Sequence, residues 1–394
     1  MLFSVLKKLS FDGTLEIIDS NDKIYKFGNS NPHVCIRLKN KSIERKLFFN
    51  PNLHIGEAYM NEELVVEKGT IEEFLNLITN CYDDFISNNK FYKFYEYLSS
   101  FFMPLQQINQ LVNSKNNVAH HYDINEDLYK LFLDKDMQYS CAYFHNPNIS
   151  LEQAQKDKKE HIIRKLQIDK NMSVLDIGCG WGGMAIEIAK STGAKVKGIT
   201  LSENQFKTAS ERAQKEGLSD NVTFALQDYR NETDKYDRIV SVGMFEHVGK
   251  PFFNSYFKKI YDLLEDDGIA VVHTIGNIRT PKITAAFIRK YIFPGGYIPS
   301  LSEIMPAIEK SGLIISDIEV LRIHYAKTLS HWYKNFKKSE SKILEIYDDK
   351  FIRMWEAYLN LSELSFTKGD NVIFQLVLTK KRDSFPLVRP KITN

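Results

Sequence analysis

A glycine-rich segment directly follows an apolar run, in Val174-Leu-Asp-Ile-Gly-Cys-Gly-Trp-Gly-Gly183. This pattern predicts a strand, a tight turn and a helix from Met184 to Lys190. Glycine is needed where the backbone must approach a bound molecule closely, because a side chain there would collide with it. The candidate ligand contacts in this turn are Gly178, Cys179, Gly180, Trp181 and Gly182.

Two kinds of cofactor use such a turn. Gly178, Gly180 and Gly183 also match the dinucleotide pattern, which expects an acidic residue for the ribose on the next strand, about 20 residues further on. That strand here ends Gly198-Ile-Thr-Leu-Ser202, and no carboxylate follows until Glu203. Asp176 at the strand end and Asp228 after a later strand instead fit a methyltransferase, whose loop holds the sulfonium compound S-adenosylmethionine. A turn without a ligand is the structural alternative.

The elements that position this loop alternate between strands and helices. The order predicts an α/β fold: a Rossmann-like class I S-adenosylmethionine-dependent methyltransferase domain with a parallel, doubly wound sheet. The strand candidates are Ser173 to Ile177, Ala194 to Thr200, Val222 to Leu226, Arg238 to Val242 and Gly268 to Thr274.

The amino-terminal region has a different pattern. Short β segments such as Thr14 to Ile18 and His33 to Leu38 are separated by turn-forming residues. From Thr70, a predicted N-cap, apolar residues recur at helical spacing as far as Phe85. We predict a smaller α+β domain over residues 1–105, followed by the catalytic domain over 106–394.

Five further blocks resemble the cyclopropane-fatty-acid synthase family. They are His121-Tyr-Asp123, Tyr139-Ser-Cys-Ala-Tyr-Phe144, Ser241-Val-Gly-Met-Phe-Glu-His-Val-Gly249, His273-Thr-Ile-Gly276 and Lys290-Tyr-Ile-Phe-Pro-Gly-Gly296. The segment Gly56-Glu-Ala-Tyr-Met60 resembles part of the accessory domain of the bacterial members. The resemblance covers nearly the whole chain, and it implies that residues 1–105 bind lipid.

The resemblance also implies which residues contact S-adenosylmethionine. Thr200 and Gln205 stand where the generic fold has its ribose carboxylate, which is a family feature. With Asp176 included, the predicted contacts are Tyr139, Ser140, Asp176, Gly178, Cys179, Gly180, Trp181, Gly182, Thr200, Leu201, Gln205, Gln227 and Asp228.

The implied reaction adds a methylene bridge across a cis double bond of an unsaturated phospholipid acyl chain. Attack by the alkene on the sulfonium methyl leaves a carbocation, and ring closure needs a base to take a proton from the added carbon. The resemblance implies a bound bicarbonate for this, held by Cys141, Glu246, His273, the backbone at Ile275, and Tyr325. In that scheme Cys141 is a hydrogen-bonding ligand, Glu246 and His273 orient the ion and relay the proton, and Tyr325 donates its hydroxyl.

Structural roles without catalysis stay open for single residues, and other functions stay open for the whole chain. Cys141 alone also fits a small buried residue, His273 a core histidine and Glu246 an ordinary loop residue. The competing functions are fatty-acyl C-methylation without ring closure, small-molecule N-methylation, and lipid binding without catalysis. A cysteine that family members often carry near the carboxyl end is replaced here by Ser362, so no thiol there takes part in the reaction. The aromatic stretches 287–297 and 332–336 are candidates for an acyl channel.

The composition limits which kinds of partner the protein is expected to bind. Lys and Arg number 52 against 50 Asp and Glu, so no global basic field favours nucleic acid. The four cysteines show no metal-site or disulfide spacing, and we predict no bound metal. Apolar runs are too short for a membrane span, and lysines at positions 7 and 8 come too early for a signal peptide. We therefore expect a cytoplasmic protein that transiently contacts the inner membrane surface to reach its phospholipid; the resemblance adds a homodimer.

Overall fold

The computed structural model describes residues 1–89, 91 and 126–389, which form two compact units. The first unit contains the described part of Met1–Gln106 together with Ile283–Phe293 and Leu329–Gly369, and the second contains the other described residues. The predicted boundary at 105 and 106, like the block His121-Tyr-Asp123, lies outside the described residues and stays a prediction. The two later segments of the first unit are a feature that the predicted division does not include.

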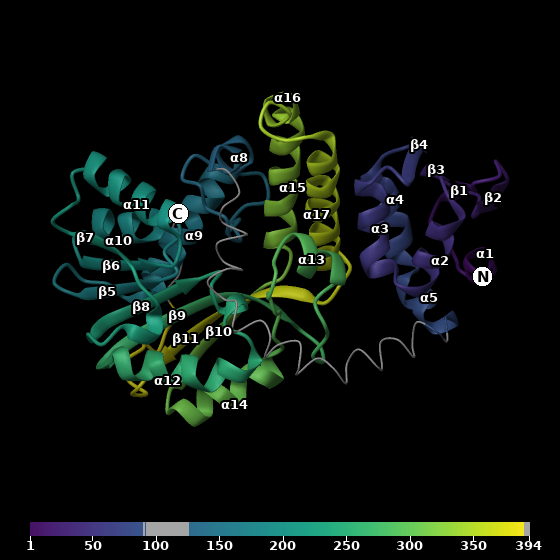
Figure 1. The fold of residues 1–394 in the computed structure, drawn as a ribbon. Helices are drawn as coiled ribbons and strands as arrows, with labels where there is room; N and C mark the ends of the chain where they lie inside the picture. Colours follow the sequence, from purple (N-terminus) through teal and green to yellow (C-terminus); the bar gives the residue numbers. More distant parts are fainter. Residues whose placement is uncertain (90, 92–125, 390–394) are drawn as a thin grey trace. The chain divides into compact units, whose positions relative to one another are not determined.

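A seven-stranded sheet forms the centre of the second unit, in the order β10-β11-β9-β8-β5-β6-β7 (Figure 1). Its strands are β5 (Ser173–Ile177), β6 (Lys195–Thr200), β7 (Val222–Leu226), β8 (Tyr236–Val242), β9 (Leu264–Asn277), β10 (Ile314–Leu321) and β11 (Asn371–Thr379). The predicted parallel arrangement is confirmed from β5 to β9. The strands β10 and β11 are not among the predicted candidates, and β11 runs antiparallel to both β9 and β10. An apolar run specifies burial but not strand direction.

Helices cover both faces of this sheet (Figure 1). One face carries α9 (Leu151–Leu166), α10 (Gly183–Thr192) and α11 (Glu203–Lys215), and the other carries α12 (Phe253–Leu263) and α14 (Leu301–Ser311). The remaining short elements are α8 (Glu126–Phe132), η1 (Tyr229–Asn231), η2 (Phe245–His247) and η3 (Lys250–Phe252). Apolar side chains of both helix layers pack on the sheet, so the predicted doubly wound α/β architecture is confirmed.

Local signals at the helix ends agree with the sequence pattern. Ser202 caps α11 by accepting a hydrogen bond from the Gln205 N–H at 3.3 Å. Gly193 ends α10 in the left-handed conformation, at φ 75°. Ser202 thereby starts α11 directly after the end of β6.

The first unit holds a four-stranded sheet in the order β2-β1-β3-β4. Its elements are α1 (Leu2–Leu6), β1 (Thr14–Ile18), β2 (Ile24–Phe27), β3 (His33–Leu38), α2 (Lys41–Phe49), α3 (Pro51–Met60), β4 (Leu64–Lys68), α4 (Ile71–Asn80), α5 (Tyr82–Asn88), α13 (Ala286–Tyr291), α16 (Glu340–Ile343) and α17 (Asp349–Thr367). The helix α15 (His324–Lys338) adds its residues from 329 onward. Thr70 caps α4, as predicted, and it also forms a capping box with Glu73. The predicted helix is interrupted at Cys81.

Two family-like blocks meet inside the first unit. Glu57 of α3 accepts hydrogen bonds from Lys290 at 2.7 Å and from the Tyr291 hydroxyl at 2.8 Å. A Cβ added at Gly56 would lie 2.5 Å from the Phe287 ring, so only glycine allows α3 to pack on α13 this closely. Phe287, Trp332 and Phe336 are fully buried in this unit. The acyl channel through these aromatic stretches stays a prediction.

Candidate active site

A cavity in the second unit lies at the carboxyl ends of β5, β6, β7 and β8, where α/β sheets commonly bind ligands. Every predicted cofactor contact except Gly182 lines it: Tyr139, Ser140, Asp176, Gly178, Cys179, Gly180, Trp181, Thr200, Leu201, Gln205, Gln227 and Asp228. Residues far apart in the chain therefore share one cavity. Their individual contacts with the cofactor stay predictions.

The glycines of the turn have two different tasks. Gly180 has φ 54°, and no atom lies within 4 Å of the position a Cβ would take, so the cavity side of the turn is open there. Gly182 has φ 83°, and its Cβ would lie 2.7 Å from Phe224 and 2.9 Å from Ala209. Gly182 thus permits packing of the helix start against β7 and α11. Its predicted role as a cofactor contact gains no support from this geometry.

Polar groups of the cavity are paired mainly with near neighbours in sequence. The Thr200 hydroxyl donates to Gln205 Oε1 at 2.8 Å, and Gln227 donates to Glu232 at 3.1 Å. Asp176 differs, because its Oδ2 is buried and has no hydrogen-bond partner within the described part of the chain. Burial raises the pKa of Asp176 to about 7. The open turn at Gly180 and the unpartnered oxygen of Asp176 fit a ligand that carries hydrogen-bond donors or positive charge, as S-adenosylmethionine does.

A buried lysine supports the loop that carries Tyr139, Ser140 and Cys141. Lys158 on α9 is 0% exposed, and its Nζ donates to Ser140 Oγ at 2.8 Å and to the Gln138 side chain. Burial lowers the pKa of Lys158 to about 8. Lys158 was missed by the sequence analysis, because a lysine in a highly charged helix resembles a surface residue.

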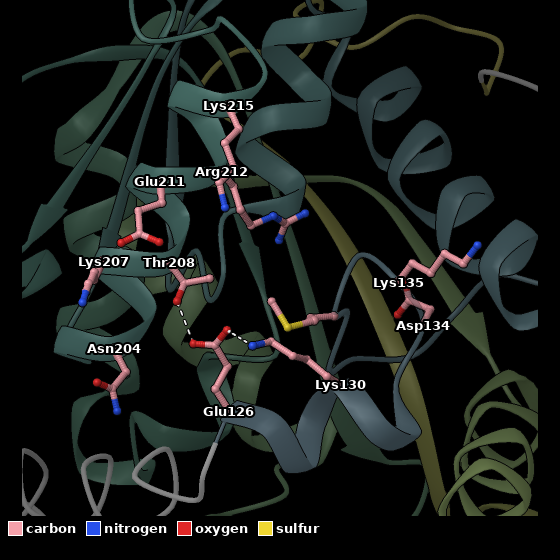
Figure 2. Close-up of a pocket in the computed structure, with 11 residues that line it drawn as sticks. Glu126, Lys130, Asp134, Lys135, Asn204, Lys207, Thr208, Glu211, Arg212 and Lys215 are labelled. Atoms are coloured by element: carbon pink, nitrogen blue, oxygen red, sulfur yellow. Dashed lines mark hydrogen bonds and ion pairs between the residues drawn. The ribbon is translucent and has the colours of Figure 1, made fainter. Parts of the chain in front are cut away.

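A second, polar pocket lies between α8 and α11 (Figure 2). Glu126, the first residue of α8, accepts a hydrogen bond from Thr208 of α11 at 2.8 Å and pairs with Lys130 at 3.0 Å (Figure 2). Arg212 from the same face of α11 pairs with Asp136 and donates to the Trp181 carbonyl at 2.8 Å. These bonds hold α11 and the glycine-rich turn against the segment that leads into Tyr139.

Glu246 and Ile275 are in direct contact. The Ile275 N–H donates to Glu246 Oε1 at 2.6 Å, while Oε2 is buried and has no hydrogen-bond partner among the residues described. Glu246 is 8% exposed, and burial raises its pKa to about 7. Met244 and His247 on either side of it in sequence line the cavity, so Glu246 borders the cofactor region. The carboxyl group is thus able to exchange a proton near neutral pH.

His273 lies on β9 two residues before Ile275, and side chains at this spacing point to the same face of a strand. The ring is 1% exposed. Its Nδ1 is 3.0 Å from the Gln375 side-chain nitrogen, and its Nε2 has no partner in the described ranges. Burial, with the nearby Lys158 and Lys165 charges, holds the pKa of His273 well below its usual value, so the ring is neutral.

Cys141 and Tyr325 are linked through their neighbours. The Ala142 N–H donates to Thr328 Oγ1 at 3.1 Å, and Thr328 stands three residues after Tyr325 on α15. Cys141 is buried, donates to the Ala142 carbonyl at 3.2 Å, and has its thiol pKa raised by burial. A neutral thiol is a poor nucleophile, in agreement with the predicted ligand role. Bicarbonate binding by the five residues stays a prediction.

The described residues contain no membrane-spanning helix, no metal-binding group and no disulfide. Among the helices of the described ranges, none is long and apolar enough to cross a membrane. In the same ranges, no three His, Cys, Asp or Glu residues are grouped so that they could hold a metal ion. The four cysteines are buried and free of disulfides.

Comparison with known proteins yields one family for most of the chain. The family model described as mycolic acid cyclopropane synthetase matches residues 109–376, and a model for a domain of unknown function matches residues 2–90. The cyclopropane-fatty-acyl-phospholipid synthase of Escherichia coli K12 is 35% identical over 89% of each chain. A probable fatty acid methyltransferase of Pseudomonas putida is 40% identical over 67% of this chain and 68% of its own.

Solved structures agree with this result. The mycolic acid cyclopropane synthase CmaA1, complexed with SAH and CTAB, is 28% identical and superposes with a TM-score of 0.64, covering 67% of this chain and 97% of its own. The cyclopropane synthase MmaA2 of Mycobacterium tuberculosis has the same TM-score of 0.64 at 29% identity. The chain therefore belongs to the mycolic acid cyclopropane synthetase family and is an S-adenosylmethionine-dependent methyltransferase.

Proposed function

We propose that this enzyme transfers the methyl carbon of S-adenosylmethionine to a cis double bond of an unsaturated phospholipid acyl chain and closes a cyclopropane ring, with bound bicarbonate as the general base. The observation that carries the proposal is the buried pair formed by Glu246 and Ile275. Among the described residues, one carboxylate oxygen of Glu246 and one ring nitrogen of His273 have no hydrogen-bond partner. Buried polar atoms are seldom left unpaired unless a ligand takes them.

S-adenosylmethionine, when bound, supplies an electrophilic methyl carbon. The residues that would hold it line the cavity, with Asp176 and the open turn at Gly180 as the fitted features. Methyl transfer from a sulfonium needs positioning and exclusion of water more than acid catalysis. The loop from Gln138 to Ser140 serves positioning, since Lys158 and Gln155 hold it by buried hydrogen bonds.

Bicarbonate, when bound, supplies a base for the proton that the added carbon must lose. In this proposal Glu246 and His273 contact the ion through their unpartnered atoms, and Cys141 and Tyr325 complete its surroundings. Glu246 can pass the proton on, because its pKa of about 7 allows both of its protonation states near neutral pH. Ile275 holds the other carboxylate oxygen and thereby fixes the direction of the group.

The choice of a phospholipid rests on the relative from Escherichia coli, which is named for that substrate and matches 89% of this chain, including the amino-terminal region. Lipid binding by residues 1–105, transient contact with the inner membrane surface, a cytoplasmic location and a homodimer are parts of the same proposal. They follow from the resemblance and await their own tests.

The test is incubation of the purified protein with S-adenosylmethionine and vesicles of cis-unsaturated phospholipid. We expect the lipid to gain the mass of one CH2 group and to lose its alkene signal in the NMR spectrum. Turnover should fall when bicarbonate is removed from the buffer and return when it is added. Transfer to small amines without any change in the vesicles would contradict the proposal.

A second candidate is fatty-acyl C-methylation without ring closure. It is favoured by the 40% identity to the probable fatty acid methyltransferase of Pseudomonas putida. A lipid product that gains the CH2 mass but keeps an alkene signal would establish this alternative. The same assay therefore separates the two functions.

A further inference from the structure

A buried line of side chains leads from His273 to α9. Gln375 on β11 lies opposite His273 on β9, and its amide nitrogen is 3.0 Å from His273 Nδ1. The amide oxygen of Gln375 is 2.6 Å from Lys165 Nζ. All three residues belong to the second unit and are 0–1% exposed.

The orientation of the Gln375 amide follows from the chemistry of its neighbours. An ammonium group has only donors, so the atom of Gln375 that faces Lys165 must be the oxygen. The NH2 group of Gln375 then faces His273 and has only donors to offer. His273 Nδ1 must accept this bond, and in a neutral imidazole the proton then sits on Nε2.

The charge on Lys165 is maintained by a carboxylate. Glu319 on β10 pairs with Lys165 and also with His161 Nε2, the latter at 2.6 Å. These partners hold the pKa of Glu319 at about 2, so Glu319 is ionised at neutral pH. Burial lowers the pKa of Lys165, while Glu319 acts in the opposite direction. The ion pair thus anchors the line at the end away from His273.

We propose that Lys165 and Gln375 are positioning residues that hold His273 in its Nε2–H tautomer, with the N–H directed at the bound anion. The inference rests on the proposed function and gives His273 one defined task within it. A ring whose Nε2 donates and whose Nδ1 accepts from Gln375 stabilises the anion but has no free site for a proton. Glu246, whose Oε2 has no partner among the described residues, is then the group that takes the proton on from the bicarbonate.

The tautomer can be observed directly in the wild-type protein. Histidine labelled with nitrogen-15 gives distinct ring signals for protonated and unprotonated nitrogens, and the His273→Asn variant identifies the His273 signals among those of the ten histidines. We expect an unprotonated Nδ1 and a protonated Nε2. A wild-type ring protonated at Nδ1 would overturn the inference without any measurement of activity.

Two variants test the positioning role. Gln375→Glu places an acceptor opposite Nδ1, so we expect the proton to move to Nδ1 and the bicarbonate concentration for half-maximal rate to rise about tenfold, since a hydrogen bond to a charged group is lost. Lys165→Met frees the amide to rotate, so we expect a mixture of tautomers and a smaller rise. Lys380→Met is the matched control, because this partly buried lysine donates to the Leu264 carbonyl instead. There the tautomer and bicarbonate dependence should be unchanged.

The outcomes separate this inference from the proposed function. An unchanged His273 tautomer in folded Gln375→Glu protein would refute the positioning role, even if wild-type protein makes cyclopropane lipid. Absence of cyclopropane product with wild-type protein would refute the proposed function, whatever the tautomer. If Gln375→Glu fails to fold, the wild-type spectrum and Lys165→Met still decide the question.

Discussion

The cofactor cavity and the buried cluster around Glu246 and His273 lie in the same unit, but their polar atoms are paired over different distances in the chain. In the cavity, Thr200 binds Gln205, and Asp228 pairs with Arg230 two residues later. In the cluster, Glu246 binds the backbone 29 residues away, and His273 meets Gln375 across 102 residues. These side-chain pairs of the cavity form within short turns, whereas those of the cluster form only in the assembled sheet.

The two regions also differ in what they leave open. The cavity offers open space at Gly180 and an oxygen of Asp176 that has no partner among the residues described. The cluster is closed to solvent and leaves single atoms of Glu246 and His273 unpartnered within the described ranges. The difference suggests binding by shape in the first region and chemistry by a few buried atoms in the second. Substitutions can test this division.

The largest effect is expected for Glu246→Ala. In the proposed mechanism Glu246 takes the proton on from the bicarbonate, so its loss should lower turnover about a thousandfold, while the affinity for S-adenosylmethionine, measured by calorimetry, stays nearly unchanged. Glu246→Gln is the control that keeps an acceptor for the Ile275 N–H. An equal loss of cofactor affinity would place Glu246 in the cavity and remove the distinction between the regions.

The pH dependence of stability should reveal the burial of Glu246. Its pKa is raised from the usual 4.5 to about 7 in the folded state, so the folded protein binds the proton more tightly than the unfolded chain. The wild type therefore loses stability as pH rises between these values, and Glu246→Gln does not share this loss. Denaturant unfolding at about pH 5 and about pH 8 should show the variant gaining about 2.5 kcal/mol relative to wild type. A constant difference would contradict the burial.

The two glycines of the turn should separate packing from binding. Gly182→Ala introduces contacts under 3 Å with Phe224 and Ala209, and we expect a loss of about 2 kcal/mol in the free energy of unfolding. Gly180→Ala meets no protein atom, so it should cost only about 1 kcal/mol of backbone strain. Because Gly180 lines the cavity, we expect calorimetry to show weaker binding of S-adenosylmethionine. If Gly180→Ala lowered the free energy of unfolding more, and Gly182→Ala weakened cofactor binding more, the roles assigned to the two glycines would be reversed.

The smallest effect is expected for Arg230→Ala. Its ion pair with Asp228 is local and the Arg230 side chain is 52% exposed, so its removal should change the free energy of unfolding by less than about 1 kcal/mol. Cofactor affinity should change little. A large loss would mean that Arg230 positions Asp228 for the cofactor and that the cavity, too, depends on distant assembly.

The sequence by itself determined the α/β fold, the strands β5 to β9 and the cavity. Each rests on a local pattern, because an apolar run, a glycine turn and a capping residue act within a few positions of one another. The strands at Ser173–Ile177 and Val222–Leu226 agree with the prediction at both ends. The predicted cofactor residues except Gly182 meet in one cavity for the same reason: they follow neighbouring strands of one sheet.

Only the tertiary structure decided the direction of β11 and the burial of the charged helix α9. Lys158, Lys165 and His161 on α9 resemble the exposed face of a helix in sequence, yet each is 0–4% exposed. They can be buried because Ser140, Gln375 and Glu319, which come from other parts of the chain, satisfy their hydrogen bonds. Such pairing spans up to 210 residues and leaves no local pattern in the sequence. For the same reason, the line of side chains from Lys165 to His273 cannot be predicted from the sequence, because it forms only when the sheet is assembled.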